Sequence, residues 1–314
     1  MSGDGETEDT DPLATDREQY AYRSGGRKLS AFPYPGGKTT YCEEIIQRLP
    51  DHRRYVEPFG GSAAVLLNKP PSHIEIYNDL DGDVVHFFEV LRERRADLQE
   101  WLYRVPFSRE VYEQWVREYF DGHRPADDIE RAGRWFYLRY SQYNGSLDRR
   151  NGFKTGGKRN EARSFRGSIH ALELIASRFA EVTIECEPFE DVLARYDHPD
   201  TVFYLDPPYY DTRSDRDHYR VGGEFDHAQL VDELRNLDGD WLVSYETLPP
   251  GLEDAATTVA SYTAMYSMSY DDQRQQRTEH IVMSFDPSEV RLFAAAQQLT
   301  LGDLSREGGE HRAE

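Results

Sequence analysis

The chain has 314 residues and a formal net charge of −21 at pH 7, because 58 Asp and Glu residues outnumber 37 Lys and Arg residues. No uninterrupted apolar run approaches the ~18 residues that a membrane-spanning helix needs. The opening segment, MSGDGETEDTDPLATDREQY, has neither the basic nor the apolar region of a signal peptide. We therefore expect a soluble cytoplasmic protein with no membrane partner, long enough for one large domain or two modest ones.

Cysteine and lysine are both scarce. Cys42 and Cys186 are too few and too isolated for a disulfide scaffold or a zinc site, and we predict no metal site. The basic residues comprise 5 Lys and 32 Arg. Few lysines with an excess of acid are typical of salt-loving organisms, in whose proteins carboxylates keep the surface hydrated. We interpret the acidity as a halophilic adaptation, which does not exclude a nucleic-acid partner.

Tails are predicted over residues 1–24 and 301–314, because both are polar and lack a hydrophobic period. Between them, short apolar runs rich in β-branched and aromatic residues predict strands. The strands are expected at 53–58, 73–79, 181–186, 201–206, 240–246 and 279–285. Helical periodicity predicts helices at 37–49, 81–103, 109–120, 127–140, 164–179 and 226–236.

This alternation of strands and helices predicts an α/β fold with a mostly parallel sheet. Residues 25–83 and 181–300 would form the sheet domain. The exception to the alternation is residues 84–180, a helix-rich stretch between the second and third strands. This stretch is long enough to be a subdomain of its own.

Positive charge is concentrated in the same stretch. The window 131–180 holds eleven basic and three acidic residues in a chain that is otherwise strongly acidic. Within it, the segment 139–167 interleaves Arg and Lys with glycines and aromatic residues. That pattern is typical of surfaces that follow nucleic-acid phosphates, and it favours phosphate binding over a merely solvated face.

The segment FPYPGGKTTY (32–41) resembles the end of a phosphate-binding loop, because GKT (37–39) matches the last positions of G-x-x-x-x-G-K-[ST]. The first glycine of that motif would stand where the chain has Phe32, and two prolines remove backbone donors. No β-rich run precedes the segment. An NTPase therefore stays an alternative enzyme class that these features disfavour.

A glycine turn follows the first predicted strand in YVEPFGGSAAVLLN (55–68), and a helix is expected after it. Gly60 and Gly61 let a ligand approach the backbone closely, as in nucleoside-binding crevices. About twenty residues further on, Asp79 ends a strand, where an acidic side chain binds ribose hydroxyls in dinucleotide folds. Asp79 could equally be the N-cap of the helix that begins near Asp81, and both interpretations stay open.

The sharpest motif is FYLDPPYY (203–210), an apolar run that ends in Asp206, Pro207, Pro208 and Tyr209. Two successive prolines end the strand and fix an extended backbone. The motif then presents a carboxylate, a carbonyl and an aromatic ring at the carboxyl end of the strand, which is where α/β folds bind ligands. This combination of acceptors and a stacking ring favours a catalytic site over a stiffened loop.

Five segments in this order, PYPGGK (33–38), EPFGGSAAVLLN (57–68), YNDLD (77–81), RYSQYNG (139–145) and DPPY (206–209), resemble the Dam-type DNA adenine N(6)-methyltransferases. The resemblance runs from about Ser30 to Phe285. It implies a Rossmann-like domain that uses S-adenosyl-L-methionine, with residues 84–180 as a target-recognition insertion. It also implies double-stranded DNA as the substrate, a nucleoid-associated location, and a cognate restriction endonuclease as a candidate partner.

The resemblance assigns roles residue by residue. Tyr34 stands where the family commonly has Trp, and Lys38 matches a contact to the methionine carboxylate. The implied cofactor-binding residues are Tyr34, Lys38, Glu57, Phe59, Gly60, Asp79, Glu187, Phe189 and Asp206. Glu187 and Phe189 would flank the cofactor's adenine, although the segment ECEPFED that contains them departs from the family pattern.

The implied catalytic residues are Asp206, Pro207, Pro208 and Tyr209. The candidate DNA-binding residues are Arg139, Tyr143, Asn144, Gly145, Arg149, Arg150, Lys154, Lys158 and Arg159. Packing against the protein body is an equally open role for Tyr143. Because the DPPY tetrad specifies an amine rather than its ring, N(4)-cytosine DNA or RNA methylation stays an alternative, as does a non-catalytic nucleic-acid-binding module.

Overall fold

A computed structural model describes residues 28–145, 147, 149–155, 159–210, 225–267 and 274–293. Its centre is a seven-stranded sheet with the strand order β3-β2-β1-β4-β5-β7-β6. Strands β1 to β5 are parallel, whereas β7 runs antiparallel to both β5 and β6. The strands are β1 (Arg54–Glu57), β2 (Ile74–Asn78), β3 (Val182–Glu185), β4 (Thr201–Leu205), β5 (Asp240–Tyr245), β6 (Thr258–Ser267) and β7 (Arg274–Met283). The predicted Rossmann-like α/β fold is confirmed.

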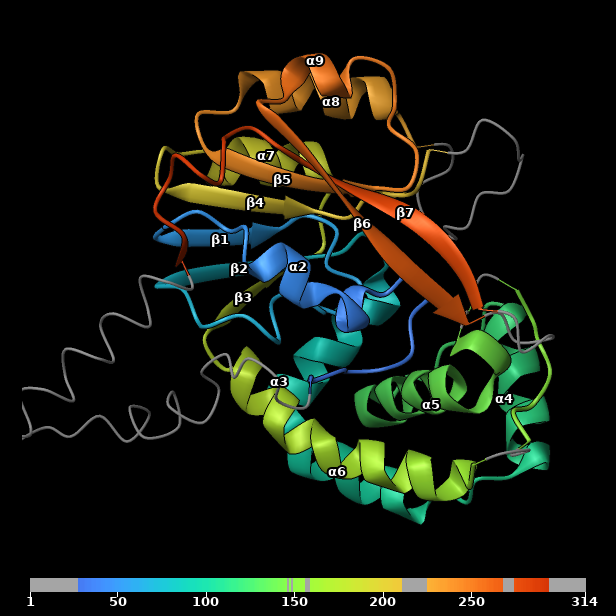
Figure 1. Cartoon of the computed structure of the whole chain (residues 1–314). Helices are drawn as coiled ribbons and strands as arrows, with labels where there is room; N and C mark the ends of the chain where they lie inside the picture. The colour runs from blue at the N-terminus through green and yellow to red at the C-terminus, as the bar shows by residue number, and fades with distance from the viewer. Residues whose placement is uncertain are drawn as a thin grey trace, which may run out of the picture.

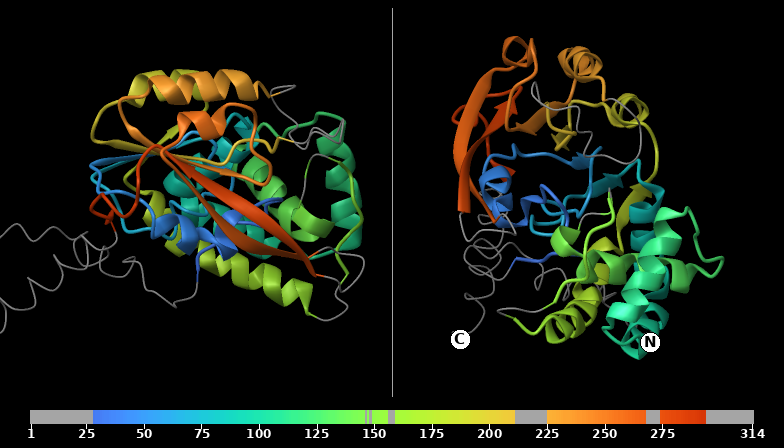
Figure 2. Two further views of the ribbon diagram at one scale, coloured as in Figure 1. Left: turned by 45° about the horizontal axis from the view of Figure 1, so that its top comes forward. Right: turned by 90° about the vertical axis from the view of Figure 1, so that its right-hand side faces the viewer.

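Helices cover both faces of this sheet, and the β6–β7 hairpin extends beyond the parallel strands towards the helical insertion (Figures 1 and 2). The 3₁₀ turns are η1 (Lys38–Thr40) and η2 (Tyr143–Gly145). The α-helices are α2 (Cys42–Ile46), α3 (Gly82–Arg104), α4 (Arg109–Phe120), α5 (Asp128–Ser141), α6 (Glu161–Phe179), α7 (Phe189–Tyr196), α8 (His227–Asn236) and α9 (Leu252–Ala255). None of the helices in these described ranges is long and apolar enough to span a bilayer.

The alternation of side chains along each strand builds two cores. On one face, Tyr55 and Tyr204 pack with α2 and the helical insertion. On the other face, Val56 and Phe203 pack with residues of α7 and α8. Because both faces are covered, the parallel strands are nearly continuous apolar runs, which is why the sequence marks them clearly.

Two sequence-based expectations differ from the structure, and three of its elements have no counterpart among the expected ones. The helix expected after Gly61 is a series of turns, because Ala63 has a left-handed backbone with φ 54° that no α-helix accommodates. The helix expected over 37–49 is confined to η1 and α2. Strand β6 and helices α7 and α9 were not predicted, since α7 and α9 are short and β6 alternates polar and apolar residues at the sheet edge.

The four helices α3 to α6 form the insertion between β2 and β3. An aromatic cluster joins the insertion to the sheet. Phe88 stacks on Phe179 with ring centroids 4.3 Å apart, and both rings contact Tyr77 of β2. The expected helix-rich stretch is therefore present, and its first and last helices pack against the sheet face that carries Tyr77.

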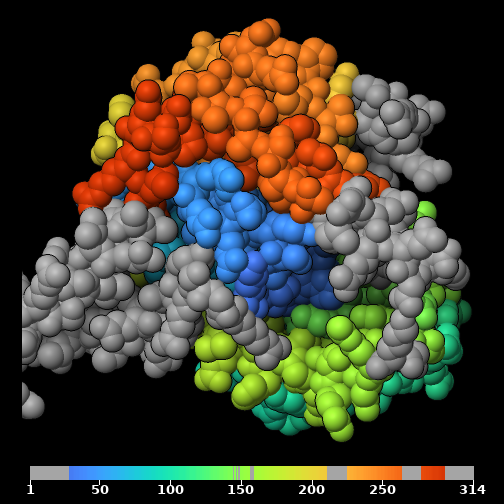
Figure 3. Space-filling view, in the orientation of Figure 1, coloured from blue at the N-terminus to red at the C-terminus, as the bar shows by residue number. Residues whose placement is uncertain are grey.

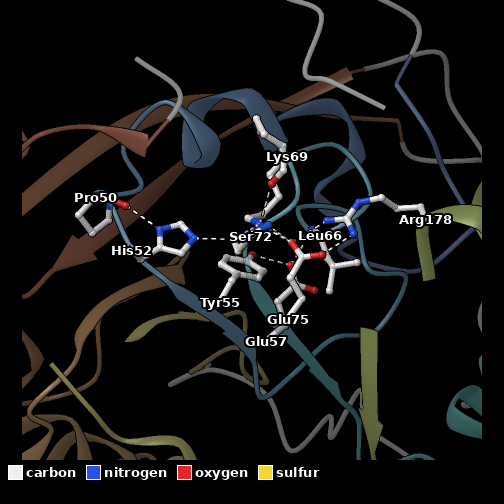
Figure 4. A network of polar contacts seen from close by, with 10 residues as sticks. Pro50, His52, Tyr55, Glu57, Leu66, Lys69, Ser72, Glu75 and Arg178 are labelled. Atoms are coloured by element: carbon white, nitrogen blue, oxygen red, sulfur yellow. Dashed lines mark hydrogen bonds and ion pairs between the residues drawn. The ribbon is translucent and has the colours of Figure 1, made fainter. Parts of the chain in front are cut away.

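A buried ionic network reinforces this junction (Figure 4). Glu75 of β2 accepts hydrogen bonds from Arg178 of α6 and from Lys69, whose Nζ lies 2.5 Å from Oε1 of Glu75. All three side chains are at most 5% exposed. Two cations and one carboxylate thus lie together in the protein interior. Removing any one of them would leave a buried charge without full compensation.

Candidate active site

The carboxyl ends of β1 and β4 adjoin at the point where the sheet reverses its strand order. In open α/β sheets this switch point is the usual place for a ligand crevice. The glycine turn follows β1, Asp79 follows β2, and Asp206 follows β4. The topology therefore brings together three motifs that are far apart in the sequence. In Figure 3 the N-terminal segment that carries PYPGGK is visible between the hairpin and the insertion.

Gly60 lies so close to its neighbours that there is no room for a side chain. Its N–H donates to the carbonyl of Asn78 over 2.7 Å. A Cβ at Gly60 would lie 2.1 Å from the Tyr77 ring, and the Tyr77 hydroxyl in turn donates to the Gly61 carbonyl. Gly61 itself has φ 48°. The turn is therefore built for glycine at both positions.

The variant Gly60→Ala is expected to weaken binding of S-adenosylmethionine, the cofactor that the sequence resemblance implies, by at least tenfold, because its methyl group would displace the Tyr77 ring or the backbone of the turn. Isothermal titration with S-adenosylmethionine measures the change. Gly167→Ala is the matched control, since a Cβ there meets no atom within 4 Å and the backbone φ is not positive. If Gly60→Ala bound the cofactor as tightly as Gly167→Ala, the turn would not form part of the cofactor site.

Asp79 accepts one backbone hydrogen bond on each carboxylate oxygen, from Gly61 over 2.8 Å and from Asp81 over 2.8 Å. The N-cap of α3 is Asp81, whose side chain accepts from the Asp83 N–H. The structure thereby separates the two interpretations of this segment: Asp81 is the cap. Burial raises the pKa of Asp79 to about 6, against the two backbone hydrogen bonds that lower it.

Glu57 lies behind the glycine turn and is 2% exposed. Its Oε1 accepts hydrogen bonds from the Tyr55 hydroxyl and the Leu66 N–H. Burial raises the pKa of Glu57 to about 7, although these hydrogen bonds favour the ionised form. Glu57 thus stabilises the backbone that follows the glycine turn, through its hydrogen bond to the Leu66 N–H.

Aromatic rings gather beside the glycine turn. Phe59 and Phe189 lie 5.4 Å apart between ring centroids, and Phe225 lies within 5.5 Å of each. Glu187 is fixed through its backbone, because Asn78 bonds both its N–H and its carbonyl. Three aromatic rings therefore form an apolar cluster at the start of α7.

Sequence reasoning missed three residues of this region. The Asn78 side chain also bonds the Pro58 carbonyl, so it ties the ends of three segments together. Phe225 completes the aromatic group. Leu80 is 43% exposed beside Asp79. The sequence signal for Leu80 was its place between two acidic residues at the end of a predicted strand.

Asp206 and Tyr209 are joined by Lys38. The Lys38 ammonium donates to Asp206 Oδ1 over 2.7 Å and to the Tyr209 hydroxyl over 2.5 Å. Burial opposes the charge of Lys38, but Asp206 and Glu279 outweigh it and raise its pKa. Burial raises the pKa of Asp206 to about 6, while Lys38 lowers it. Asp206 keeps contact with solvent, its side chain being 22% exposed.

The position of Lys38 also bears on the phosphate-loop alternative. No strand precedes η1 in the described part of the chain from residue 28 onward. The Lys38 ammonium contacts the DPPY tetrad and the Gly36 carbonyl. A Walker lysine must instead be free to reach phosphates. These contacts argue against an NTPase.

Arg139 and Gly145 occupy positions that differ from the expected DNA contacts. Arg139 is 4% exposed, and its guanidinium lies 4.8 Å from the ring centroids of Tyr34 and Trp135. It donates to the carbonyl of Gly145, which is buried against Pro33. Both residues therefore hold the insertion against the PYPGGK motif, and this burial disfavours a direct contact of the Arg139 side chain with DNA.

Other members of the basic window form ion pairs within the protein. Arg150 pairs with Glu113, and Lys154 pairs with Glu161. Several positive charges of this basic window are therefore neutralised by intramolecular ion pairs. The remaining cations of this kind are Arg131, Arg134 and Arg178.

Four of the candidate DNA contacts are exposed. Arg149, Arg150 and Arg159 lie at the surface, and Tyr143 is 37% exposed. The Tyr143 backbone is held by the Gly152 carbonyl. Its exposed ring is thus not part of the core, whereas packing against the protein body would require a buried ring. Lys158 lies outside the described residues, as does the environment of the Asn144 side chain.

Known proteins match this chain over the segment that carries the site. It is 31% identical over 193 residues to a DNA adenine methylase of Vibrio cholerae, covering 58% of this chain and 66% of the relative. It is 28% identical over 190 residues to a DNA adenine methylase of Escherichia coli K12, again covering 58% and 66%. The matched part is thus just under two thirds of each relative.

A third relative is larger. A DNA N-6-adenine-methyltransferase of Escherichia phage P1 is 28% identical over 185 residues, which cover 57% of this chain and 24% of that protein. The family profile of the D12 class N6 adenine-specific DNA methyltransferases matches residues 34–276. That span includes the glycine turn, Asp79, the insertion and the DPPY tetrad. The chain belongs to the D12 class N6 adenine-specific DNA methyltransferase family.

Proposed function

We propose that this protein transfers a methyl group from S-adenosyl-L-methionine to the exocyclic amine of adenine in double-stranded DNA. The observation that carries the proposal is the position of the DPPY tetrad at the switch point, beside the glycine turn and Asp79. Family membership supports adenine as the target base. The enzyme would act at specific sites, either alone or with a cognate restriction endonuclease as partner.

The residues present fit the cofactor. The glycine turn leaves no room for a side chain, which suits close backbone approach by a ligand. Asp79 retains acceptor capacity for ribose hydroxyls, because each oxygen accepts one backbone hydrogen bond and has a second lone pair. Phe189 and the exposed Leu80 offer apolar surface for an adenine ring. When bound, S-adenosylmethionine supplies an electrophilic methyl group on a sulfonium.

Asp206 supplies the acceptor that the target amine requires. The amine lone pair is delocalised into the base, so it becomes a better nucleophile when its hydrogens are held out of the ring plane. Asp206 and the Pro207 carbonyl would accept those hydrogens, and the Tyr209 ring would stack on the base. Positioning and electrostatics then account for the rate, and Asp206 need not be a strong base. The base must first leave the duplex, because its amine is inaccessible inside the stack.

The helical insertion, residues 84–180, is the proposed target-recognition subdomain. The exposed side chains of Tyr143, Arg149 and Arg159 are its best candidates for contacts to DNA. Arg150 and Lys154 could join them only by exchanging the carboxylates of Glu113 and Glu161 for phosphates. Arginine suits both phosphate contacts and bidentate recognition of guanine.

The direct test is to incubate the purified protein with labelled S-adenosylmethionine and unmethylated genomic DNA at several salt concentrations, and then to digest the DNA to nucleosides. Label in N(6)-methyladenine is the expected result. Label in cytosine would keep the chemistry and change the target. No label in DNA, with the cofactor bound and RNA also unlabelled, would favour a non-catalytic nucleic-acid-binding protein.

The activity is expected to fall at acidic pH. Asp206 must be ionised to accept the amine hydrogens, and its pKa of about 6 places the acidic limb of kcat/KM near that value. Measuring kcat/KM for DNA at saturating cofactor suppresses the titration of Asp79, which has a similar pKa. A profile that stays flat down to pH 4.5 in folded protein would contradict an ionised Asp206.

The same shift has the opposite sign for stability. The folded pKa of Asp206 is raised from the ordinary 3.8 to about 6, so the folded state binds the proton more tightly than the unfolded chain. Between those two pH values, the contribution of Asp206 to the free energy of unfolding decreases as the pH rises. Activity and this stability contribution therefore change in opposite directions.

A further inference from the structure

We propose that Glu279 of β7 is a positioning residue of the active site, which orients Tyr209 and Lys38 for the proposed reaction. This inference rests on the proposed methyl transfer and adds a residue that the DPPY, glycine-turn and PYPGGK motifs do not contain. Glu279 lies three residues beyond the segment that the family profile matches.

The contacts of Glu279 are directed at the tetrad. Its Oε1 accepts the Tyr209 hydroxyl over 3.0 Å, and its Oε2 accepts the Tyr262 hydroxyl over 2.8 Å. The Lys38 ammonium lies 3.6 Å from Oε2. Because each oxygen is bonded to a different tyrosine, the plane of the carboxylate is fixed, and the Tyr209 ring is held at its far end.

Burial of the Glu279 carboxylate is unfavourable for stability unless its partners compensate for the lost hydration. Glu279 is 0% exposed, and a carboxyl group without compensation is strongly disfavoured at such a place. Its neighbours along the strand, Ile281 and Val282, belong to the apolar cores. An apolar residue would suit the strand equally well. Instead the chain places a carboxylate whose partners include two of the groups proposed to act in catalysis.

The hairpin explains how Glu279 reaches the site. Glu279 lies opposite Tyr262 in the β6–β7 register, and β7 pairs with β5, which is next to β4. The tetrad follows β4, so β7 approaches it from across one intervening strand. Tyr209 is thus clamped between η1 on one side, through Lys38, and β7 on the other.

Glu279 also acts on Asp206 through its charge. The groups that face Asp206 are Lys38 from η1, Tyr204 on β4, Tyr209 after β4, Tyr262 on β6 and Glu279 on β7. Burial contributes most to the raised pKa of Asp206, Lys38 opposes it, and Glu279 raises it further. Removing the charge of Glu279 therefore lowers the pKa of Asp206.

The test is the variant Glu279→Gln, assayed with labelled S-adenosylmethionine and unmethylated genomic DNA. We expect kcat to fall by about tenfold to hundredfold, as for loss of one hydrogen bond to a charged group. The dissociation constant of the cofactor should change by less than twofold. The acidic limb of kcat/KM should move to lower pH, a shift that general loosening of the fold would not cause.

Glu246→Gln is the matched control, because Glu246 is a carboxylate that pairs with Arg277 of the same strand and does not contact the tetrad. Its kcat and pH profile should equal those of the wild type. In a Tyr209→Phe background, Glu279→Gln should lower kcat by a smaller factor than in the wild type, since the Tyr209 hydroxyl is one of the links that Glu279 uses.

The outcomes distinguish this inference from the function on which it rests. A wild-type protein that methylates no nucleic acid refutes the proposed function. An active wild type with Glu279→Gln within twofold of its kcat and pH profile refutes the role of Glu279 alone. If Glu279→Gln does not fold, Tyr209→Phe decides: a kcat equal to that of the wild type overturns the role of the clamp, whereas a tenfold loss supports it.

Discussion

Replacing Asp206 by Asn is expected to lower kcat by about 10²–10⁴-fold, while the cofactor and DNA still bind within a fewfold of the wild type. Asn preserves the size of the side chain and removes its charge. One of its two terminal atoms becomes a donor, which cannot accept a hydrogen from the target amine. Single-turnover rates with labelled S-adenosylmethionine measure the loss of the chemical step.

The loss has a second cause in the structure. Asp206 is the closest anion to Lys38, at 2.7 Å, and the ion pair holds the lysine beside the tetrad. Asp200→Asn is the matched control, because Asp200 precedes β4 at the opposite end of the same strand and its side chain is 59% exposed. An Asp206→Asn preparation that methylated DNA at the rate of Asp200→Asn would remove Asp206 from the mechanism.

Glu75→Gln is expected to lower the free energy of unfolding by about 3–5 kcal/mol, because it leaves two buried cations without their shared carboxylate. Those cations are Lys69 and Arg178, which are 0% and 5% exposed. Burial lowers the pKa of Lys69 to about 8 even with Glu75 present, so the lysine has little tolerance for losing it. Urea unfolding followed by circular dichroism measures the change.

The control for that variant replaces the whole network. Lys69→Met, Glu75→Leu and Arg178→Met together remove all three charges and keep comparable volume, and such replacements are often neutral. We expect the triple variant to be more stable than Glu75→Gln. The reverse order would show that the network contributes through something other than charge compensation.

The sign of the pH dependence follows from Glu75 itself. Burial opposes its ionisation, but Lys69 and Arg178 outweigh burial and lower its pKa from 4.5 to about 2. The stability that Glu75 contributes is therefore fully present above pH 4.5 and is lost as the pH falls towards 2. Glu75→Gln should lack this part of the acid unfolding transition.

The parallel strands were predictable because their burial on both faces leaves an apolar signature. The five runs expected at 53–58, 73–79, 181–186, 201–206 and 240–246 coincide with β1 to β5 within one or two residues at each end. Strand β6 gave no such signature, since its outer edge and part of its faces are exposed, as Val259 at 41% illustrates. Edge strands need fewer apolar residues, and the sequence reveals them less readily.

The candidate site was predictable where a motif constrains the backbone. Gly60 and the prolines of DPPY announce unusual conformations in the sequence itself. Glu279 announces nothing, because a single Glu in a strand is normally exposed and its partners are between 17 and 241 positions away. Arg139 was expected at the DNA surface because a charged residue is normally exposed. The structure instead packs its guanidinium against the rings of Tyr34, which is distant in sequence, and Trp135.

The helical insertion leaves the sheet after β2 and returns to it at β3, which are adjacent strands. Its anchors are α3 and α6, through Phe88 and Arg178. The described residues between 105 and 160 lie between these anchors and contribute no strand to the sheet. The length and sequence of α4 can therefore vary without altering strand order, whereas α5 must be retained, because Arg139 and Gly145 hold the PYPGGK motif.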